Sequence, residues 1–167
     1  STDRTVELAE RFLNRLHLLI VHHEHNKGLG PAIKTGLFKA IERSRSGDDA
    51  IVYMDADCTH SPHYVPAMVE LIDKGADIVI ASRFLPGSKE VGVPLLRRIY
   101  SRGARILFRL YLPLPGVTDY TCGFRAYRSA LIRQALERFG DSIIQRTGFA
   151  CTDELLVNLA TFDINIA

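Results

Sequence analysis

The 167-residue sequence holds only three cysteines and no long apolar run, and each of these two shortages excludes a class of protein. Cys58, Cys122 and Cys151 are odd in number and widely spaced, so neither a disulfide framework nor a Cys-x-x-Cys zinc site is predicted. A reducing compartment fits this cysteine usage best. No segment approaches the roughly 20 apolar residues that cross a bilayer, and no secretory signal opens the chain.

The net charge is small, +2, which argues against nucleic-acid binding through a general excess of positive charge. Hydrophobic residues make up 47% of the chain, enough for one domain with a core, and the length is too short for two. We therefore expect a single domain over residues 1–167. Ser1-Thr2-Asp3 has the pattern of a helix cap and residues 162–166 that of an unfinished strand, so we expect part of a longer protein.

Apolar runs alternate with segments of helical periodicity along the chain. Strands are predicted at Leu18 to Val21, Ala50 to Met54, Asp77 to Ala81 and Phe124 to Tyr127. Helices are predicted at residues 6–16, 31–44, 62–74, 95–112, 129–139 and 153–160. The alternation is typical of an α/β protein with a mostly parallel sheet covered by helices on both faces.

Two carboxylates, Asp55 and Asp57, come directly after the apolar strand that ends at Met54. In open parallel sheets, ligands bind beyond the carboxyl ends of the strands, where both acids are predicted to lie. Side chains two apart on an extended segment point the same way, so both can face one hard divalent cation, which in turn can hold a diphosphate. An isolated Asp-x-Asp also occurs as a turn that caps the next helix.

Two segments earlier in the chain have a polar pattern. Asn26-Lys27-Gly28-Leu29-Gly30 puts two glycines before a helix, which suits close approach by a phosphate or a base and is also found in an ordinary loop. The cluster His22-His23-Glu24-His25 is interpreted as a solvated strand end, because contiguous residues on a strand point to opposite faces.

The segment from Leu95 to Leu112 carries five arginines and no acid. Four of the arginines form a stripe along one helix face: Arg98, Arg102, Arg105 and Arg109. The opposite face is aliphatic, as in a helix at an anionic membrane surface or beside a lipid phosphate. A merely solvated face has the same pattern.

Asp119 and Arg125 flank the segment Thr121-Cys122-Gly123-Phe124, where the glycine permits a tight backbone turn. The acid suits two interpretations. It is either part of a structural turn or a group that orients or deprotonates an acceptor.

In their order along the chain, these segments resemble the family 2 glycosyltransferases of the GT-A fold, and most closely the dolichyl-phosphate (polyprenyl-phosphate) mannosyltransferases. The resemblance covers nearly the whole chain. The residues that carry it are Ser1-Thr2-Asp3, Asn26 to Gly30, Met54 to Pro62, Ala81 to Phe84, Arg97 to Ala104, Asp119 to Arg125 and Glu154 to Leu156. It implies a GT-A (Rossmann-like) α/β fold, truncated at both ends, because the family's amino-terminal strand with its Pro-x-x-Asn-Glu turn is absent before Ser1.

The resemblance further implies an inverting transfer of a sugar, mannose from GDP-mannose, to a polyprenyl or dolichyl phosphate with Mg²⁺ or Mn²⁺. Asp55 and Asp57 match the aspartates that bind the metal and the diphosphate, and Asp57 is also counted as catalytic. Asn26, Lys27 and Gly28 match the donor-side loop. Thr59 stands where some relatives have a glutamine that helps to bind the metal, which leaves the third protein ligand open.

On the acceptor side, the resemblance assigns the lipid phosphate to Arg83, Arg97, Ser101 and Glu154, with Asp119 as a catalytic acid beside it. A phosphate monoester is already largely ionised at neutral pH, so it needs little help from a base. We therefore rank Asp119 as an orienting residue before a base.

The nearest alternative function is a family 2 transferase that uses UDP-glucose or another donor. An alternative of another class is a non-catalytic domain that binds anionic lipid or a partner protein through the basic helix. Nucleic acid is not expected as a partner, because aliphatic side chains outnumber stacking aromatics among the arginines. The expected location is cytoplasmic, peripheral at the cytoplasmic face of a membrane.

Overall fold

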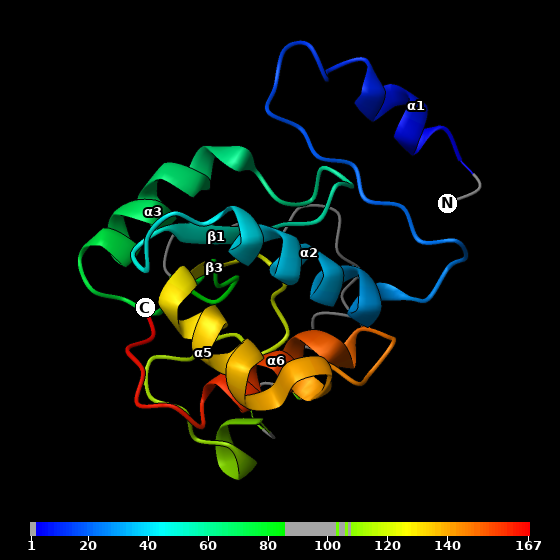
Figure 1. The fold of residues 1–167 in the computed structure, drawn as a ribbon. Helices are drawn as coiled ribbons and strands as arrows, with labels where there is room; N and C mark the ends of the chain where they lie inside the picture. Colours follow the sequence, from blue (N-terminus) through cyan, green and yellow to red (C-terminus); the bar gives the residue numbers. More distant parts are fainter. Residues whose placement is uncertain (1–2, 86–102, 104–105, 107) are drawn as a thin grey trace.

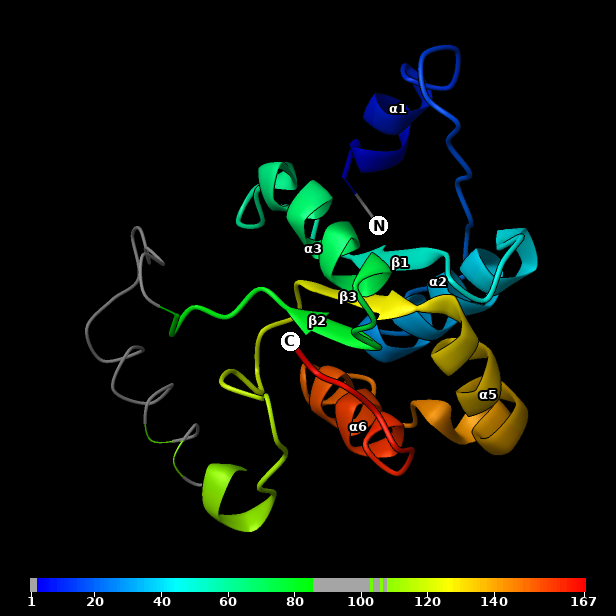
Figure 2. The same ribbon diagram turned by 90° about the vertical axis from the view of Figure 1, so that its left-hand side faces the viewer.

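The computed structural model describes residues 3–85, 103, 106 and 108–167. Its described sheet has three strands in the order β1 (Ala50–Tyr53), β3 (Arg125–Arg128) and β2 (Ile78–Ile80). The central strand β3 is antiparallel to both neighbours, so β1 and β2 run in the same direction (Figure 2). The register places Tyr53, Arg125 and Ile80 in one row across the sheet.

The α/β class is confirmed, and the strand pairing differs from the expectation of a mostly parallel sheet. Both ladders among the described residues are antiparallel. The described residues also form a parallel contact, an isolated bridge between Ile78 and Ile166. An apolar run identifies a strand and not its direction, because side-chain alternation is the same in both orientations. The long excursion between β2 and β3 brings β3 back in the opposite sense.

Helices cover both faces of the sheet, as predicted (Figure 2). The 3₁₀ turn η1 (Pro62–Tyr64) leads into α3 (Val65–Asp73) on one face, and Gly75, at φ 104°, follows the end of this helix. The other face carries α2 (Leu29–Arg43), α5 (Ser129–Phe139), the 3₁₀ turn η2 (Gly140–Ile143) and α6 (Ala150–Leu159).

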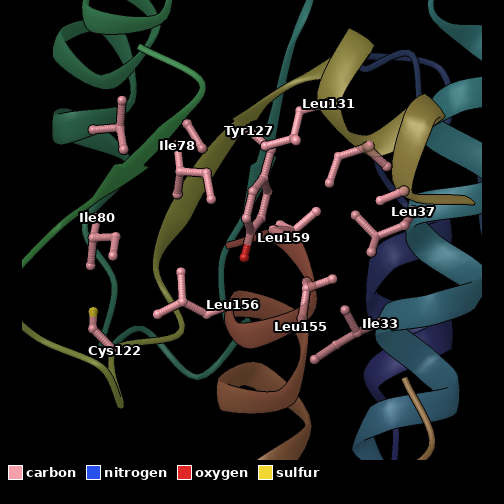
Figure 3. Packing of buried hydrophobic residues seen from close by; sticks show 14 of the residues in the cluster. Ile33, Leu37, Ile78, Ile80, Cys122, Tyr127, Leu131, Leu155, Leu156 and Leu159 are labelled. Atoms are coloured by element: carbon pink, nitrogen blue, oxygen red, sulfur yellow. The ribbon is translucent and has the colours of Figure 1, made fainter. Parts of the chain in front are cut away.

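The core lies on both sides of the sheet, since its buried cluster includes Met68 and Ile72 of α3 as well as residues of α2, α5 and α6. Figure 3 shows the Tyr127 ring of β3 near leucines of α6, with Ile33 and Leu37 of α2 in the same buried cluster. Tyr127, Leu155 and Leu159 are at most 1% exposed. Each such side chain contributes about 1.5–3 kcal/mol of apolar burial to the folded state.

The prediction of a strand at Leu18 to Val21 is wrong. The first helix, α1 (Thr5–Glu10), is shorter than expected, and the irregular segment after it leaves Leu19 and Val21 each 44% exposed. Figure 1 shows α1 and this segment apart from the helices that surround the sheet. A strand needs a ladder partner for its backbone groups, and β1 pairs only with β3 within the described part of the chain.

The predicted basic helix from Leu95 to Leu112 lies mostly outside the described residues. Of its length, Gly103, Ile106 and residues 108–111 are described and helical. Among the described helices none has the length and apolar character needed to span a bilayer.

Candidate active site

Several predicted site residues gather at the end of the sheet where β1 and β2 finish and β3 begins. Asp55 lies just beyond β1, Arg83 lies just beyond β2, and Asp119 lies in the loop that enters β3. The amino end of α6 joins them, because the buried Arg125 guanidinium donates from Nη1 to the Thr152 carbonyl at 2.8 Å. The order β1-β3-β2 therefore brings segments far apart in sequence to one edge.

Asp55 is held by neighbours on both its side chain and its backbone. The Tyr53 hydroxyl donates to Asp55 Oδ1 at 2.8 Å, and the Asp55 backbone N–H donates to His60 Nδ1 at 2.9 Å. Burial raises the pKa of the Tyr53 hydroxyl, and the hydrogen bond to the Asp55 carboxylate raises it further. Tyr53 thus remains a protonated donor at physiological pH.

Asp57 lies on the exposed loop that follows. Its Oδ1 accepts the Thr59 backbone N–H at 3.0 Å and the Thr59 hydroxyl at 2.5 Å. These hydrogen bonds lower the pKa of the Asp57 carboxyl, so it is ionised at neutral pH. The backbone bends from Ala56 onward and Cys58 has φ 65°. Asp57 therefore lies in a turn and not on the extended segment that the sequence predicted for both acids.

The acid loop borders a cavity of about 310 Å³. Its lining residues are Met54, Asp55, Ala56, Cys58, His60, Ser61 and Pro62. In the described ranges no group of three or more His, Cys, Asp or Glu is arranged to hold a metal. Asp55 and Asp57 offer carboxylate oxygens, which are the kind of ligand that a hard cation such as Mg²⁺ takes.

Arg83 and Asp119 form a two-point ion pair. Arg83 Nε lies 2.8 Å from Asp119 Oδ2 and Nη2 lies 2.9 Å from Oδ1, with Thr121 Oγ1 2.6 Å from the same Nη2. Asp119 is 1% exposed, whereas the Arg83 side chain is 36% exposed. Burial alone would raise the pKa of Asp119, but the Arg83 hydrogen bonds and charge bring it below its ordinary value. Asp119 is thus a fixed carboxylate that orients an accessible guanidinium.

Asp153 was not among the predicted site residues. Its Oδ1 is buried and without a hydrogen-bond partner in the structure, and the same is true of Arg125 Nε. Burial raises the pKa of Asp153 to about 6, Arg125 opposes this shift and Asp119 adds to it. Asp153 occupies the first turn of α6, a position that neither periodicity nor motif spacing singles out.

Glu154, by contrast, is engaged by the backbone. Its Oε2 accepts the N–H groups of Gln145 and Arg146 at 2.9 and 2.8 Å. The next residue, Thr147, accepts the first N–H groups of α2 from Leu29 and Gly30. Glu154 thus shapes the loop that caps α2.

The glycine loop before α2 makes its close approach to protein backbone. A Cβ placed on Gly30 would lie 1.8 Å from the Arg146 carbonyl oxygen, and one on Gly28 would lie 2.6 Å from that of Thr147. Asn26 Oδ1 accepts the Gly28 N–H at 2.9 Å, while Lys27 is exposed. Two other predicted site residues, Arg97 and Ser101, lie outside the described residues.

Comparison with known proteins places this site in context. Residues 1–136 match the family model described as "Glycosyl transferase family 2". A dolichol-phosphate mannosyltransferase of Pyrococcus furiosus is 35% identical over 133 residues, 79% of this chain and 36% of the relative. A polyprenol monophosphomannose synthase of Mycolicibacterium smegmatis is 34% identical over 153 residues, 89% of this chain and 54% of the relative.

An undecaprenyl-phosphate mannosyltransferase of Micrococcus luteus is 39% identical over 114 residues, 68% of this chain and 45% of the relative. The matched part of the chain therefore spans between 36% and 54% of the length of these three curated relatives.

Proposed function

Because this chain belongs to glycosyltransferase family 2, we propose that it carries the active site of an enzyme that transfers a sugar from a nucleotide donor to a polyprenyl phosphate. The proposed sugar is mannose, in keeping with the names of the relatives, and the proposed donor is GDP-mannose. An acceptor phosphate oxygen bonds to the anomeric carbon as the bond to the nucleoside diphosphate breaks, with inversion. The observation that carries this proposal is the pairing of a carboxylate loop with an accessible arginine at one sheet end.

Asp55 and Asp57 are the proposed ligands of a Mg²⁺ or Mn²⁺ ion. The hydrogen bonds from Tyr53 and Thr59 occupy Oδ1 of Asp55 and of Asp57, and each carboxylate has a second oxygen with lone pairs of its own. When bound, such a cation neutralises the charge that grows on the departing nucleoside diphosphate. The lowered pKa of Asp57 supports this role, because a ligand of a hard cation must be deprotonated.

On the acceptor side, Arg83 binds the lipid phosphate and Asp119 fixes its orientation. A guanidinium held at two points by a buried carboxylate keeps a planar array of donors in one place, which favours a phosphate nucleophile aligned with the sugar. Asp119 does not act as a general acid, because its pKa lies below the ordinary value. Arg97 and Ser101 are proposed to complete the phosphate site.

The remaining predicted residues have supporting roles in this proposal. Asn26 and Lys27 face the donor just before α2, with Lys27 exposed for contact with phosphate, and Gly28 supports them because its N–H donates to Asn26 Oδ1. Glu154 acts at the acceptor side through the loop that it holds, since its Oε2 already accepts two backbone N–H groups.

We place the enzyme at the cytoplasmic face of a membrane, docked through the segment from Leu95 to Leu112. The described part of this segment supports docking, because Ile106, Leu110 and Tyr111 are 61%, 72% and 85% exposed beside Arg109. Exposed apolar side chains next to a cation are typical of helices that lie at an anionic interface.

The donor assignment is tested by assaying the full-length protein with a polyprenyl phosphate, Mn²⁺ and either labelled GDP-mannose or labelled UDP-glucose. We expect label in the lipid fraction from GDP-mannose. Transfer from UDP-glucose alone would assign another donor. Absence of transfer from either, with binding to anionic liposomes intact, would indicate a non-catalytic lipid-binding domain.

A further inference from the structure

His60 lies outside the acid pair and fixes the place where that pair leaves β1. The Asp55 N–H donates to His60 Nδ1 at 2.9 Å, so the neutral ring carries its proton on Nε2. Nε2 lies 3.9 Å from Asp55 Oδ2, too far for a hydrogen bond and close enough for attraction between the N–H dipole and the carboxylate. The same ring thus contacts both the backbone and the charge of Asp55.

The ring of His60 is itself held in place. Its side chain is only 17% exposed and stacks on the buried Phe124 ring, with centroids 5.0 Å apart and planes 12° from parallel. Gly123 leaves room for the rings, since a Cβ there would lie 3.1 Å from Tyr53 Cε1 and 3.9 Å from His60 Cε1. The segment that enters β3 therefore packs against the rings of Tyr53 and His60 and holds them in place.

We propose that His60 is a positioning residue that closes the loop from Asp55 to His60 and so presents both aspartates in the geometry that binds the divalent cation. This inference rests on the proposed function, in which Asp55 and Asp57 hold the cation with the donor diphosphate. His60 acts through Asp55, whose backbone N–H it accepts. Partners of this kind orient metal ligands in many sites, and their loss commonly weakens metal affinity by about 10–100-fold.

Three variants of the full-length protein separate this role from simple packing. His60→Phe keeps a ring that can stack on Phe124 and removes the acceptor for the Asp55 N–H. His60→Asn places a side-chain oxygen near the position of Nδ1 and restores the acceptor. His63→Phe is the matched control, because His63 is exposed three residues further on in the turn η1.

Binding of Mn²⁺ alone is measured by electron paramagnetic resonance of the free ion, and activation by Mn²⁺ is measured in turnover with GDP-mannose. We expect His60→Phe to weaken Mn²⁺ binding by roughly tenfold or more, with kcat largely recovered at saturating Mn²⁺. His60→Asn and His63→Phe should bind Mn²⁺ nearly as the wild type does. Equal Mn²⁺ affinity in the wild type and a folded His60→Phe variant would overturn the inference.

The tautomer of His60 tests the same contact without a substitution and covers the case in which His60→Phe does not fold. Nitrogen-15 NMR of the metal-free wild type should show a proton on Nε2 and none on Nδ1. A proton on Nδ1 would overturn the inference. A wild type that neither binds Mn²⁺ nor needs a metal for transfer would instead overturn the proposed function, whatever the tautomer.

Discussion

At the scale of single residues, the carboxylates of the site differ in what surrounds them. Asp57 is exposed and ionised, Asp119 is buried and paired with Arg83, and Asp153 is partly buried with an unpaired oxygen. These environments agree with the different roles proposed for them: cation binding for Asp57 and orientation of a guanidinium for Asp119, while burial raises the pKa of Asp153 to about 6.

Asp57→Asn tests the first of these roles. The substitution keeps the size of the side chain and removes its charge, so we expect metal-dependent transfer to fall by roughly 10²–10³-fold, the range seen when a group that stabilises developing charge is lost. The measurement is transfer of label from GDP-mannose at saturating Mn²⁺. Asp73→Asn, at an exposed position at the end of α3, is the control and should retain activity.

Asp153→Asn tests the buried acid through stability. The pKa of Asp153 is raised from 3.8 to about 6 in the folded chain, so its proton stabilises the fold fully below about pH 4, and that contribution is lost as pH rises through about 6. The amide of the Asp153→Asn variant does not ionise, so this fall in stability with rising pH is absent. The Asp153→Asn variant should therefore be more stable than the wild type at about pH 7. We expect its free energy of unfolding to be higher by roughly 1 kcal/mol, a small value because Asp153 is only partly buried and solvent screens its charge.

Thermal unfolding from about pH 4 to pH 8 measures this difference. The gain in Tm should vanish toward about pH 4, where both side chains are neutral. A gain that stays constant across the range would contradict the raised pKa.

The place of Asp55 and Asp57 just after a strand end was predictable from sequence, because an apolar run precedes the Asp-x-Asp motif. Tyr53, His60 and Asp153 were not predicted as site residues. Their roles depend on contacts with Asp55 and Arg125 that arise only when the loops are folded, and no spacing in the sequence records them.

At the scale of elements, the amino end of α2 shows why glycine is needed where the chain comes close to itself. Gly30 faces the Arg146 carbonyl, which belongs to the loop held by Glu154. The sequence pattern suggested room for a ligand at this point, and the structure fills that room with backbone. α2 is therefore fixed to the segment that precedes α6.

Gly30→Ala should destabilise the fold, because its Cβ would meet the Arg146 oxygen at 1.8 Å and force the two segments apart. We expect a loss of about 1–3 kcal/mol, measured by urea unfolding. Gly36→Ala on the same helix is the matched control. Within the described part of the chain, no atom beyond the helix's own backbone and the neighbouring residues lies within 4 Å of a Cβ there, so Gly36→Ala should stabilise the helix by roughly 0.5–1 kcal/mol. A Gly30→Ala variant as stable as Gly36→Ala would contradict the packing.

Strands β1 and β2 and helices α2, α3, α5 and α6 were predicted from periodicity, with ends shifted by a few residues. Continuous apolar runs and helical spacing are local signals, so they survive folding. The direction of β3 and the false strand at Leu18 to Val21 were decided by partners elsewhere in the chain. Local pattern alone does not contain that information.

At the scale of the whole molecule, the family resemblance drawn from the ordered motifs is confirmed by the match over residues 1–136. Each motif is weak by itself, and their order along the chain is what made the family recognisable. The fold brings the acid loop, the Arg83–Asp119 pair and the start of α6 to one end of the sheet.

The proposed docking to a membrane belongs to this scale. Leu110 is 72% exposed and is proposed to insert into the membrane interface. Leu110→Glu should therefore weaken sedimentation with anionic liposomes, because it puts a negative charge at this position. Leu16→Glu, at a leucine that is 60% exposed on the amino-terminal segment, is the control. Equal binding by both variants and the wild type would contradict docking through this helix.

In the proposed active site, Asp55 and Asp57 together bind a divalent cation at the end of β1. Crystals of the full-length protein soaked with Mn²⁺ and GDP-mannose test it directly through anomalous scattering from manganese. We predict a single strong peak within coordination distance of both carboxylates, with the donor diphosphate on its other side. Carboxylates that point into solvent, with no manganese beside them while the donor is bound, would contradict it.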